Sequence, residues 1–299
     1  MRRWFTIARK RLSRMSLVVL VGCIRTVASF LPFRLAVLSG GWLGSIAFYL
    51  LPRDRKRAMD NLTAVFPEKG PVWVRRTAKA MFVHLGKSLL EAVALTGDKI
   101  QALIEWRGLE NLHGALLQGK GLVFVTGHIG NWEIMAGAVA AECPLSVIAA
   151  PIEPDAVNDT IIDLREKLGV RTIVRSRPGA TKELIRVFRE KRVMGLLIDQ
   201  DTDVDGVFVD FMGRPAWTPS AAASMAIKFD APVVFGYIER LPDDRHRITI
   251  EGPLDIEKTG NAEKDVLVNT AVLTKRIEKA IYRHPEQWVW MHRRWRRQP

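Results

Sequence analysis

The chain has 299 residues, of which 48% are hydrophobic, and a formal net charge of +13 from 45 Lys and Arg against 32 Asp and Glu. This length and apolar content allow one large globular domain or two small ones, and the positive charge indicates an acidic partner such as nucleic acid, an anionic membrane surface or an acidic protein. The two cysteines, Cys23 and Cys143, lie far apart without metal-ligand spacing, which argues against a disulfide framework and a zinc site and suits a reducing compartment.

The first 52 residues are basic and apolar. Residues 1–15 contain six Arg and Lys and no acid, two apolar stretches follow at 16–31 and 35–51, and basic residues resume at 53–57. A secretory signal peptide fits this pattern poorly, and neither stretch is a clean span of about 20 apolar residues. Because positive charge flanks both ends, we expect residues 1–52 to form membrane-anchoring helices, as a shallow hairpin or monotopic anchor. Two buried core helices are the alternative.

Residues 53–299 are expected to form one catalytic domain. Residues 53–120 look helical, with a helix end at Phe66-Pro67. Strand and helix patterns then alternate. Strands are expected at 121–126, 145–150, 171–174 and 193–198, helices at 131–142, 155–168, 180–191, 219–229 and 263–283, a loop before residue 219, and paired strands at 232–238 and 247–251. The alternation predicts an α/β fold with a mainly parallel central sheet flanked by helices, plus an N-terminal helical membrane-associating segment.

The segment from Gly127 to Glu133 is the most informative one. It follows the strand at 121–126, and the carboxyl ends of strands are where open α/β sheets bind ligands. We place His128 on the turn and Glu133 in the first turn of a helix capped by Asn131, so that the carboxylate reaches back toward the ring. In that arrangement His128 is a general base for a substrate hydroxyl, and Glu133 orients it. A structural histidine is the alternative.

The His-x4-Glu spacing alone is weak evidence, since this composition yields about 0.6 chance matches. A second match, His246 to Glu251, lies in an alternating strand pattern, where residues five apart point to opposite faces. Only the first match has a strand end and flanking glycines. No Ser or Cys nucleophile signature accompanies it, which favours direct attack by a substrate hydroxyl, with backbone amides after Gly130 as candidate donors to the oxyanion.

Other polar residues are candidates for substrate binding. Asp199 and Gln200 end another predicted central strand, on the same edge as His128. Arg175 and Arg177 follow a short strand and suit a phosphate or carboxylate clamp. We also count Asn131 among the substrate-binding candidates. A solvated polar turn is the alternative for each pair.

Two later segments combine apolar and basic residues. Residues 208–216 either cover the core or form the wall of a groove for an acyl chain. Residues 288–297 interleave Trp with Arg, which suits nucleic-acid binding or interfacial membrane contact. The N-terminal segments favour the membrane interpretation.

In combination, these segments resemble the bacterial lipid A biosynthesis acyltransferases, the lauroyl and myristoyl transferase family with a glycerolipid acyltransferase-like fold. The resemblance covers nearly the whole chain. It rests on Arg57-Ala58 with Asn61-Leu62 and Phe66-Pro67, Gly127-His128 with Glu133, Asp199-Gln200, residues 208–216, and Pro285-Glu286-Gln287-Trp288 with Trp290, His292, Arg293 and Trp295.

The resemblance implies transfer of a fatty acyl group from acyl carrier protein, or coenzyme A, to a hydroxyl of a membrane glycolipid, with a lipid A precursor as the first choice. It implies attachment to the bacterial inner membrane with the site on the cytoplasmic face. His128 is then the base, Glu133 its partner, and no cofactor or metal is needed. The expected partners are acyl carrier protein and anionic membrane lipid and glycolipid, not nucleic acid.

The resemblance leaves the acceptor open at one position. Many relatives carry an Arg before the Pro that aligns with Ala150-Pro151, and this chain lacks it. Another glycolipid, such as phosphatidylinositol mannoside, or a lysophospholipid therefore stays an alternative acceptor. A basic membrane-associated binding protein without catalysis is the alternative from a different class.

Overall fold

The computed structural model describes residues 32–94, 97–175 and 177–299. At its centre lies a seven-stranded sheet in which only the β8–β9 pair is antiparallel, which confirms the predicted α/β class with a mainly parallel sheet. The order is β1 (Ile104–Arg107), β9 (His246–Glu251), β8 (Val233–Arg240), β2 (Leu122–Thr126), β5 (Val193–Leu197), β3 (Leu145–Ala149) and β4 (Arg171–Val174).

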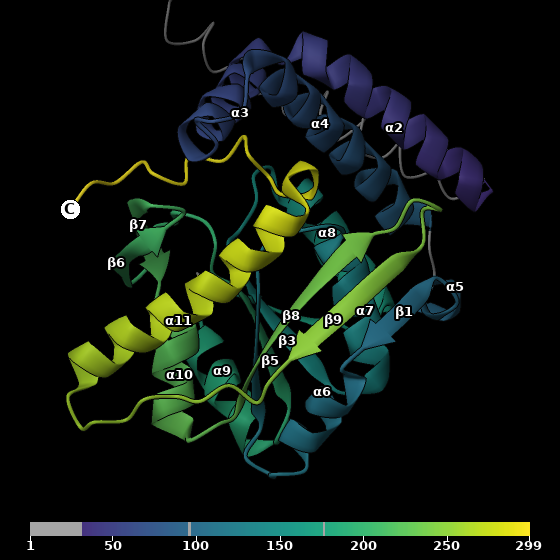
Figure 1. Ribbon diagram of the computed structural model, residues 1–299. Coiled ribbons are helices and arrows are strands. Elements are labelled where there is room, and N and C mark those ends of the chain that lie inside the picture. The colour runs from purple at the N-terminus through teal and green to yellow at the C-terminus, as the bar shows by residue number, and fades with distance from the viewer. Residues whose placement is uncertain (1–31, 95–96, 176) are drawn as a thin grey trace, which may run out of the picture.

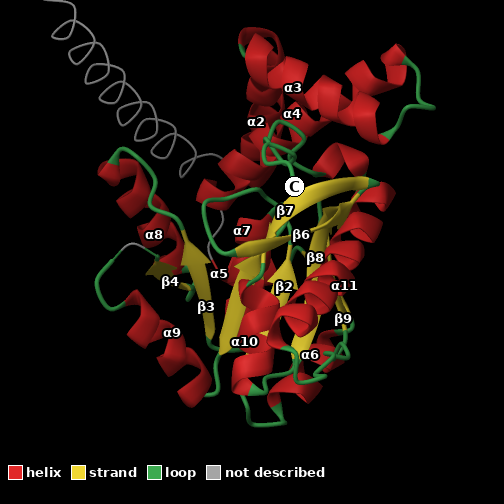
Figure 2. Cartoon of the chain, turned by 90° about the vertical axis from the view of Figure 1, so that its left-hand side faces the viewer, coloured by secondary structure: helices red, strands yellow, loops and turns green. Residues whose placement is uncertain are grey.

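Helices cover both faces of this sheet (Figures 1 and 2). Strand β2 shows why: Val123 and Val125 pack into one apolar cluster, and Leu122 and Phe124 into another. A strand that is apolar on both of its alternating faces needs cover on each. The first cluster contains side chains of α9 (Ala180–Arg189), α10 (Ala221–Phe229) and α11 (Ala262–Arg283), and the second those of α5 (Gly97–Gln101), α6 (Leu109–Leu116) and α7 (Trp132–Glu142). Helix α8 (Asp155–Lys167) packs beside α7 and β4.

Helices α2 (Phe33–Leu50), α3 (Pro52–Val65) and α4 (Pro71–Ala94) form a cap beyond one end of the sheet (Figures 1 and 2). The cap is built on close contact between α2 and α4, which is possible only because glycines face each other. A Cβ on Gly44 would lie 2.1 Å from the carbonyl oxygen of Phe82, and a Cβ on Gly86 would lie 2.1 Å from that of Gly40. The two backbones therefore touch directly along this line.

The outer face of α2 is apolar and uncovered. Leu38, Trp42 and Leu50 are 60%, 75% and 71% exposed. By length and composition, α2 is long and apolar enough to cross a membrane, and about a third of it is buried inside the protein. The second apolar stretch predicted from the sequence is this helix. The basic residues 1–15 and the first apolar stretch lie outside the described residues, and the division at residue 52 stays a prediction.

Two strand elements differ from the sequence-based expectation. β1 lies within the stretch that looked helical, and it is a four-residue edge strand too short to show a periodicity. The loop predicted before residue 219 contains an antiparallel hairpin of β6 (Gly206–Phe211) and β7 (Arg214–Pro219). Its turn places Met212 and Gly213 at positive φ, which is the geometry that two-residue hairpin turns require.

The tryptophans of the C-terminal segment after α11 are buried, so the interpretation of this segment as an interfacial membrane contact is wrong. After the short helix η1 (Pro285–Gln287), Trp288 and Trp290 are 1% and 0% exposed. The guanidinium of Arg294 lies 4.5 Å from the ring centre of Phe211, and burial lowers its pKa to about 10. The mixture of Trp and Arg arises from packing inside the protein, where the cation lies against an aromatic face.

This segment also ties the cap to the sheet. The side-chain amide of Asn61 in α3 donates to the carbonyl oxygens of Trp290 and His292, at 2.8 and 3.1 Å. Arg57 donates to the carbonyl oxygen of Met291 at 3.1 Å. The chain segments at residues 57–62 and 285–295 are therefore one structural unit.

Candidate active site

The turn that carries His128 is determined by its two glycines. A Cβ on Gly127 would lie 3.0 Å from an Asp199 carboxylate oxygen, and one on Gly130 would lie 2.0 Å from the carbonyl oxygen of Ile238. Gly130 also has a φ of +63°. Larger residues at either position would displace the turn from the sheet edge. As predicted, Asn131 then caps α7 by accepting from the backbone N–H of Ile134.

His128 is paired with Asp199, which follows the neighbouring strand β5. The ring Nδ1 lies 2.7 Å from Asp199 Oδ1, and the backbone N–H of His128 donates to Oδ2 at 2.7 Å. Asp199 is completely buried, whereas the side chain of His128 is 22% exposed. Because Nδ1 faces a carboxylate, we assign its proton there, which leaves Nε2 as the acceptor nitrogen.

Asp199 is held ionised by its surroundings. Burial alone would raise its pKa, but the His128 charge, the His128 hydrogen bonds and the bond from Trp288 Nε1 at 2.7 Å together lower that pKa to about 2. A carboxylate that stays charged at neutral pH orients the imidazole and stabilises the imidazolium that forms when the ring takes a proton. The arrangement therefore contains a general base and its orienting acid.

Glu133 does not reach back to the ring, in contrast to the sequence-based expectation. Its carboxylate forms a two-pronged ion pair with Arg165 of α8, at 2.8 and 2.6 Å, and accepts from Trp132 Nε1 at 3.2 Å. Within the first turn of α7, the Glu133 side chain points toward α8 and away from His128. The Trp132 ring contacts His128 edge to face, with 4.9 Å between centroids.

A cavity of about 540 Å³ opens beside His128 and Trp132. Its walls come from residues following β2, β3, β4 and β5, and from the starts of α9 and α10, so it lies where the parallel strands end. Most of the lining is apolar, with a few polar groups, a composition typical of a site for a small molecule with an alkyl part. The lining residues are His128, Trp132, Ile148, Ala149, Ala150, Ile152, Arg165, Ile173, Arg175, Ala180, Thr181, Leu184, Leu196, Leu197, Ile198, Gln200, Thr202, Val204, Pro219, Ala221 and Met225.

The structure brings some of the predicted substrate-binding residues to this cavity and not others. Arg175 and Gln200 line it. Arg177 lies outside its lining, 61% exposed, and is paired with Asp159 at 3.6 Å. Asp199 is buried against the ring and has no access to a substrate. Asn131 is buried, donates to Glu91 of α4 at 2.8 Å and caps the start of α7. Its side chain therefore has a structural role.

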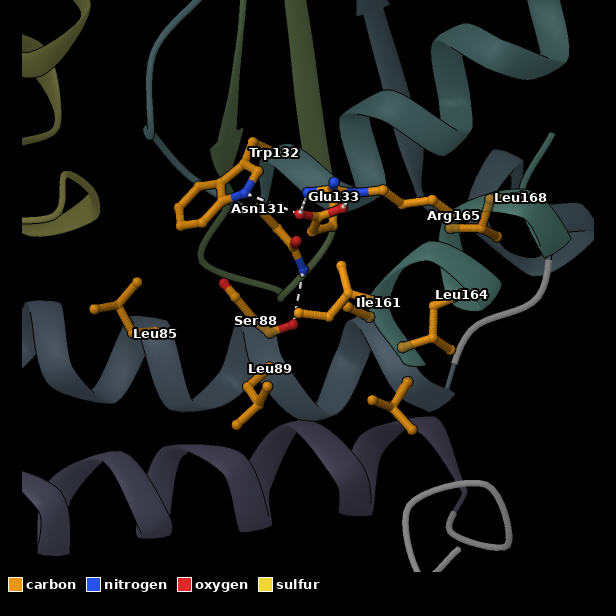
Figure 3. A pocket seen from close by; sticks show the side chains of 12 residues that line it. Leu85, Ser88, Leu89, Asn131, Trp132, Glu133, Ile161, Leu164, Arg165 and Leu168 are labelled. Carbon is orange, nitrogen blue, oxygen red and sulfur yellow. Dashed lines mark hydrogen bonds and ion pairs between the residues drawn. The ribbon is translucent and has the colours of Figure 1, made fainter. Parts of the chain in front are cut away.

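A second cavity, of about 290 Å³, lies between α4, the start of α7 and α8 (Figure 3). Its lining is apolar except for a few side chains, among them Glu133 and Arg165, which meet at its upper wall in Figure 3. Trp132 and Arg165 line both cavities. The indole and the Glu133–Arg165 ion pair therefore form the partition between them.

Three residues of this site were missed or given another role from the sequence. Asp199 takes the position that Glu133 was expected to occupy, and Trp288 and Arg165 were not among the candidates. A polar residue ending a second apolar strand was the available signal for Asp199. Trp288 reaches the site from 89 residues further along the chain, and nothing local indicates such a contact. Among residues 32–94, 97–175 and 177–299, no group of three or more His, Cys, Asp and Glu side chains could hold a metal ion.

Comparison with known proteins identifies the family that the chain matches. Residues 5–297 match the family described as bacterial lipid A biosynthesis acyltransferase. Among similar proteins, a phosphatidylinositol mannoside acyltransferase of Mycobacterium tuberculosis is 29% identical over 193 residues, or 63% of this chain and 58% of that protein. The lipid A biosynthesis acyltransferase 2 of Shigella flexneri is 27% identical over 91% of this chain and 86% of its own length. The lipid A biosynthesis lauroyltransferase of Escherichia coli is 24% identical over 90% and 88%.

The matched part thus spans less than two thirds of the mycobacterial protein and most of the other two. The family match extends over almost the entire sequence, including the turn with His128, the strand end with Asp199 and the buried C-terminal segment. The chain belongs to the bacterial lipid A biosynthesis acyltransferase family.

Proposed function

We propose that the chain is an O-acyltransferase that moves a fatty acyl group from an acyl thioester to a hydroxyl of a membrane glycolipid. Membership of the family makes it an acyltransferase of the lipid A or glycolipid type. The observation that carries the finer proposal is the His128–Asp199 pair, because it places a base at the wall of a largely apolar cavity. A lipid A precursor is the proposed acceptor, and acyl carrier protein the proposed donor.

The pair supplies the proton transfers that this reaction needs. Nε2 of His128 takes the proton of the acceptor hydroxyl while its oxygen attacks the thioester carbonyl carbon. The imidazolium is stabilised by Asp199 and returns that proton to the departing sulfur as the carbon–sulfur bond breaks. The products are an ester and a thiol, and the ring ends in its starting state. The mechanism proposed here requires no cofactor.

The transient oxyanion needs hydrogen-bond donors. The N–H of Gly130 donates to the carbonyl oxygen of Gln287, and that of Ile134 to Asn131. The N–H groups of Trp132 and Glu133, in the first turn of α7, have no acceptor within the helix. We propose this first turn as the donor site, with Glu133 holding Arg165 in the cavity wall.

The cavity lining suits the two parts of the substrates. Apolar side chains such as Ile173 and Leu184 provide surface for an alkyl chain, whereas Arg175 and Gln200 can bind polar groups. We propose Arg175 as the partner of an anionic group on the acceptor, since a guanidinium matches phosphate geometry.

A phosphatidylinositol mannoside is the second candidate acceptor. Ala150 lines the cavity, where the resemblance to the family leads us to expect an Arg, and three similar proteins are named phosphatidylinositol mannoside acyltransferases. A smaller, uncharged residue at the wall leaves room for a different headgroup. We propose the cytoplasmic face of the inner membrane as the location, with the exposed face of α2 contacting lipid.

Acyl transfer to extracted lipid tests the proposal. Radiolabelled acyl-acyl carrier protein and acyl-coenzyme A are offered separately to the wild type, to His128→Ala and to the control His113→Ala, whose side chain is on the protein surface. We expect transfer by the wild type and the control, and a loss of about 10²–10⁴ in rate for His128→Ala. Equal transfer by all three proteins would rule out His128 as the base.

Two other readouts address the remaining alternatives. Mass spectrometry of host lipids with and without the protein identifies the acylated molecule and thereby separates a lipid A precursor from a phosphatidylinositol mannoside. Complete extraction without detergent, together with salt-dependent DNA binding, would favour a nucleic-acid binder instead.

A further inference from the structure

A third cavity lies on the side of α4 away from the two already described. It has a volume of about 430 Å³, and it lies between α4, the end of β8 and η1. Four cations line it: Arg76, Lys79 and Lys87 from one face of α4, and Arg240 from β8. None of them takes part in the acyl-transfer mechanism proposed above.

The charges in this cavity are only partly compensated. Arg240, whose side chain is 6% exposed, pairs with Glu91 at 2.6 Å, and Lys87 pairs with Asp244 at 2.7 Å. Among the described residues, neither Arg76 nor Lys79 forms an ion pair, and Lys79 lies over the Tyr49 ring at 5.5 Å. Glu286 is the one acidic residue among the described residues that line the cavity, so the lining has an excess of positive charge.

One side chain of the lining, Arg240, has a buried hydrogen-bond donor that is not used. Nε of Arg240 is buried and has no hydrogen-bond partner among the described residues. His84, which also lines the cavity, adds no positive charge. Burial, reinforced by the Arg240 charge, lowers the pKa of His84 to about 3 and keeps its ring neutral. An anion is the class of ligand that complements two cations that form no ion pair with a described residue.

The cavity borders the apolar outer face of α2. Lys79 reaches the ring of Tyr49, which is 53% exposed on α2, and the Lys87 side chain packs beside Gly41 of the same helix. A basic site at the rim of an exposed apolar helix face has the arrangement of a membrane interface, where the apolar side contacts acyl chains and the cations contact headgroups. A lipid that complements both sides has acyl chains and a headgroup of net negative charge, such as the phosphate of an anionic phospholipid.

We propose that this cavity binds the phosphate of an anionic phospholipid of the supporting membrane, through Arg76 and Lys79, and that the site is distinct from the catalytic cavity. The proposal rests on the membrane contact of α2 and is independent of acyl transfer. The site lies behind the catalytic turn. Gln287 exchanges two hydrogen bonds with the backbone of Arg240, and its carbonyl oxygen accepts from the N–H of Gly130.

Vesicle binding tests the site directly. The full chain is titrated with vesicles of phosphatidylcholine alone and of phosphatidylcholine mixed equally with phosphatidylglycerol. The test variant is Arg76→Gln/Lys79→Gln. The matched control is Lys182→Gln/Arg189→Gln on α9, which removes the same charge far from the cap. Circular dichroism verifies that each variant is folded.

We expect the wild type and the α9 control to bind the mixed vesicles more tightly than phosphatidylcholine vesicles. The Arg76→Gln/Lys79→Gln variant should lose at least about tenfold in affinity for the mixed vesicles, and little for phosphatidylcholine. Equal losses in both double variants would show a response to net charge alone and would overturn the proposal, as would no loss in either.

A soluble competitor distinguishes a membrane headgroup from free phosphate. The competitor is glycerol phosphate. If it displaced the wild type from vesicles at a concentration no higher than that of the lipid, the result would contradict a lipid site. Acyl transfer to a detergent-solubilised acceptor is measured in parallel. Unchanged transfer in the Arg76→Gln/Lys79→Gln variant separates this site from the catalytic one, and a loss of transfer equal to that of His128→Ala would place it in the catalytic site instead.

Discussion

His128 and Asp199 are 71 residues apart in the chain and 2.7 Å apart in space. Each ends a strand of the same parallel pair, β2 and β5, whose register places Thr126 opposite Leu197. The imidazole is thus oriented by a neighbour in the sheet and not by a neighbour in the sequence. Glu133, the acid nearest in sequence, serves Arg165 instead.

This difference leads to a prediction at the level of single residues. Asp199→Asn should lower kcat by about 10²–10⁴, because the amide cannot stabilise the imidazolium. Glu133→Gln should have a much smaller effect on kcat and a larger one on the KM of a substrate, because it loosens a cavity wall. Steady-state kinetics of both variants make the comparison. Equal kcat losses in the two would restore Glu133 as the partner of the ring.

At the level of elements, the cap depends on the line of glycines between α2 and α4. Gly44 and Gly86 have no room for a side chain, since backbone oxygens lie 2.1 Å from where their Cβ atoms would be. Such contact lets one helix be held firmly while its opposite face stays apolar and exposed. A helix of this kind is anchored to the protein on one side and available to a membrane on the other.

Gly86→Leu should therefore force the two helices apart. We expect a destabilisation of about 1–3 kcal/mol, typical of overpacking. Gly114→Ala on α6 is the control, because its Cβ meets nothing within 4 Å, and alanine there should stabilise by about 0.4–1 kcal/mol. Urea unfolding measures both. An unchanged midpoint for Gly86→Leu would show that the contact between α2 and α4 is loose.

At the level of the whole molecule, a buried polar cluster joins the cap to the sheet. Glu91 of α4 accepts a hydrogen bond from Arg240 of β8 and lies 2.9 Å from His246 of β9. Burial by itself would raise the pKa of Glu91, but the contacts with His246 and Arg240 outweigh burial and lower that pKa to about 2. His84, on the same face of α4, contacts Ser88 and is kept neutral, with a pKa of about 3. The cap and the sheet therefore respond to acid as one unit.

The neutral His84 gives the protein a defined pH dependence. Its pKa in the folded state lies below the unfolded value of about 6.5, so the unfolded chain binds more protons below pH 6.5 and stability falls as the pH drops from 6.5 toward 3. Each group of this kind changes the free energy of unfolding by up to about 1.4 kcal/mol per pH unit. Glu91 contributes separately, with stability present above about pH 4.5 and lost toward pH 2.

His84→Gln should reduce the slope of unfolding free energy against pH between pH 6.5 and about 4, and the part that remains comes from His292, whose pKa burial lowers to about 4. The measurement is the free energy of unfolding in urea at a series of pH values. His113→Gln, at a partly exposed surface position, is the matched control and should keep the slope of the wild type. The same slope in His84→Gln and the wild type would show that the buried ring does not set the acid response.

Local pattern was enough for most of the α/β layer. Period-two burial and continuous apolar runs predict β2, β3, β4 and β5 and the helices between them, because these elements bury side chains at regular spacing. The β6–β7 hairpin and β1 were not predicted, because the hairpin depends on a turn at positive φ and β1 has only four residues. The C-terminal Trp and Arg residues were misinterpreted because composition does not distinguish a membrane interface from a buried cation against an aromatic ring.

By itself, the sequence determined the fold class, the family and the position of His128 at a strand end, because apolar periodicity and glycine turns are properties of neighbouring residues. The tertiary structure alone decided which acid serves the ring. It also decided that Trp288 reaches that acid from the end of the chain, and which basic residues of α4 line a common cavity. These depend on strand order and helix packing, which bring together groups that no local spacing relates.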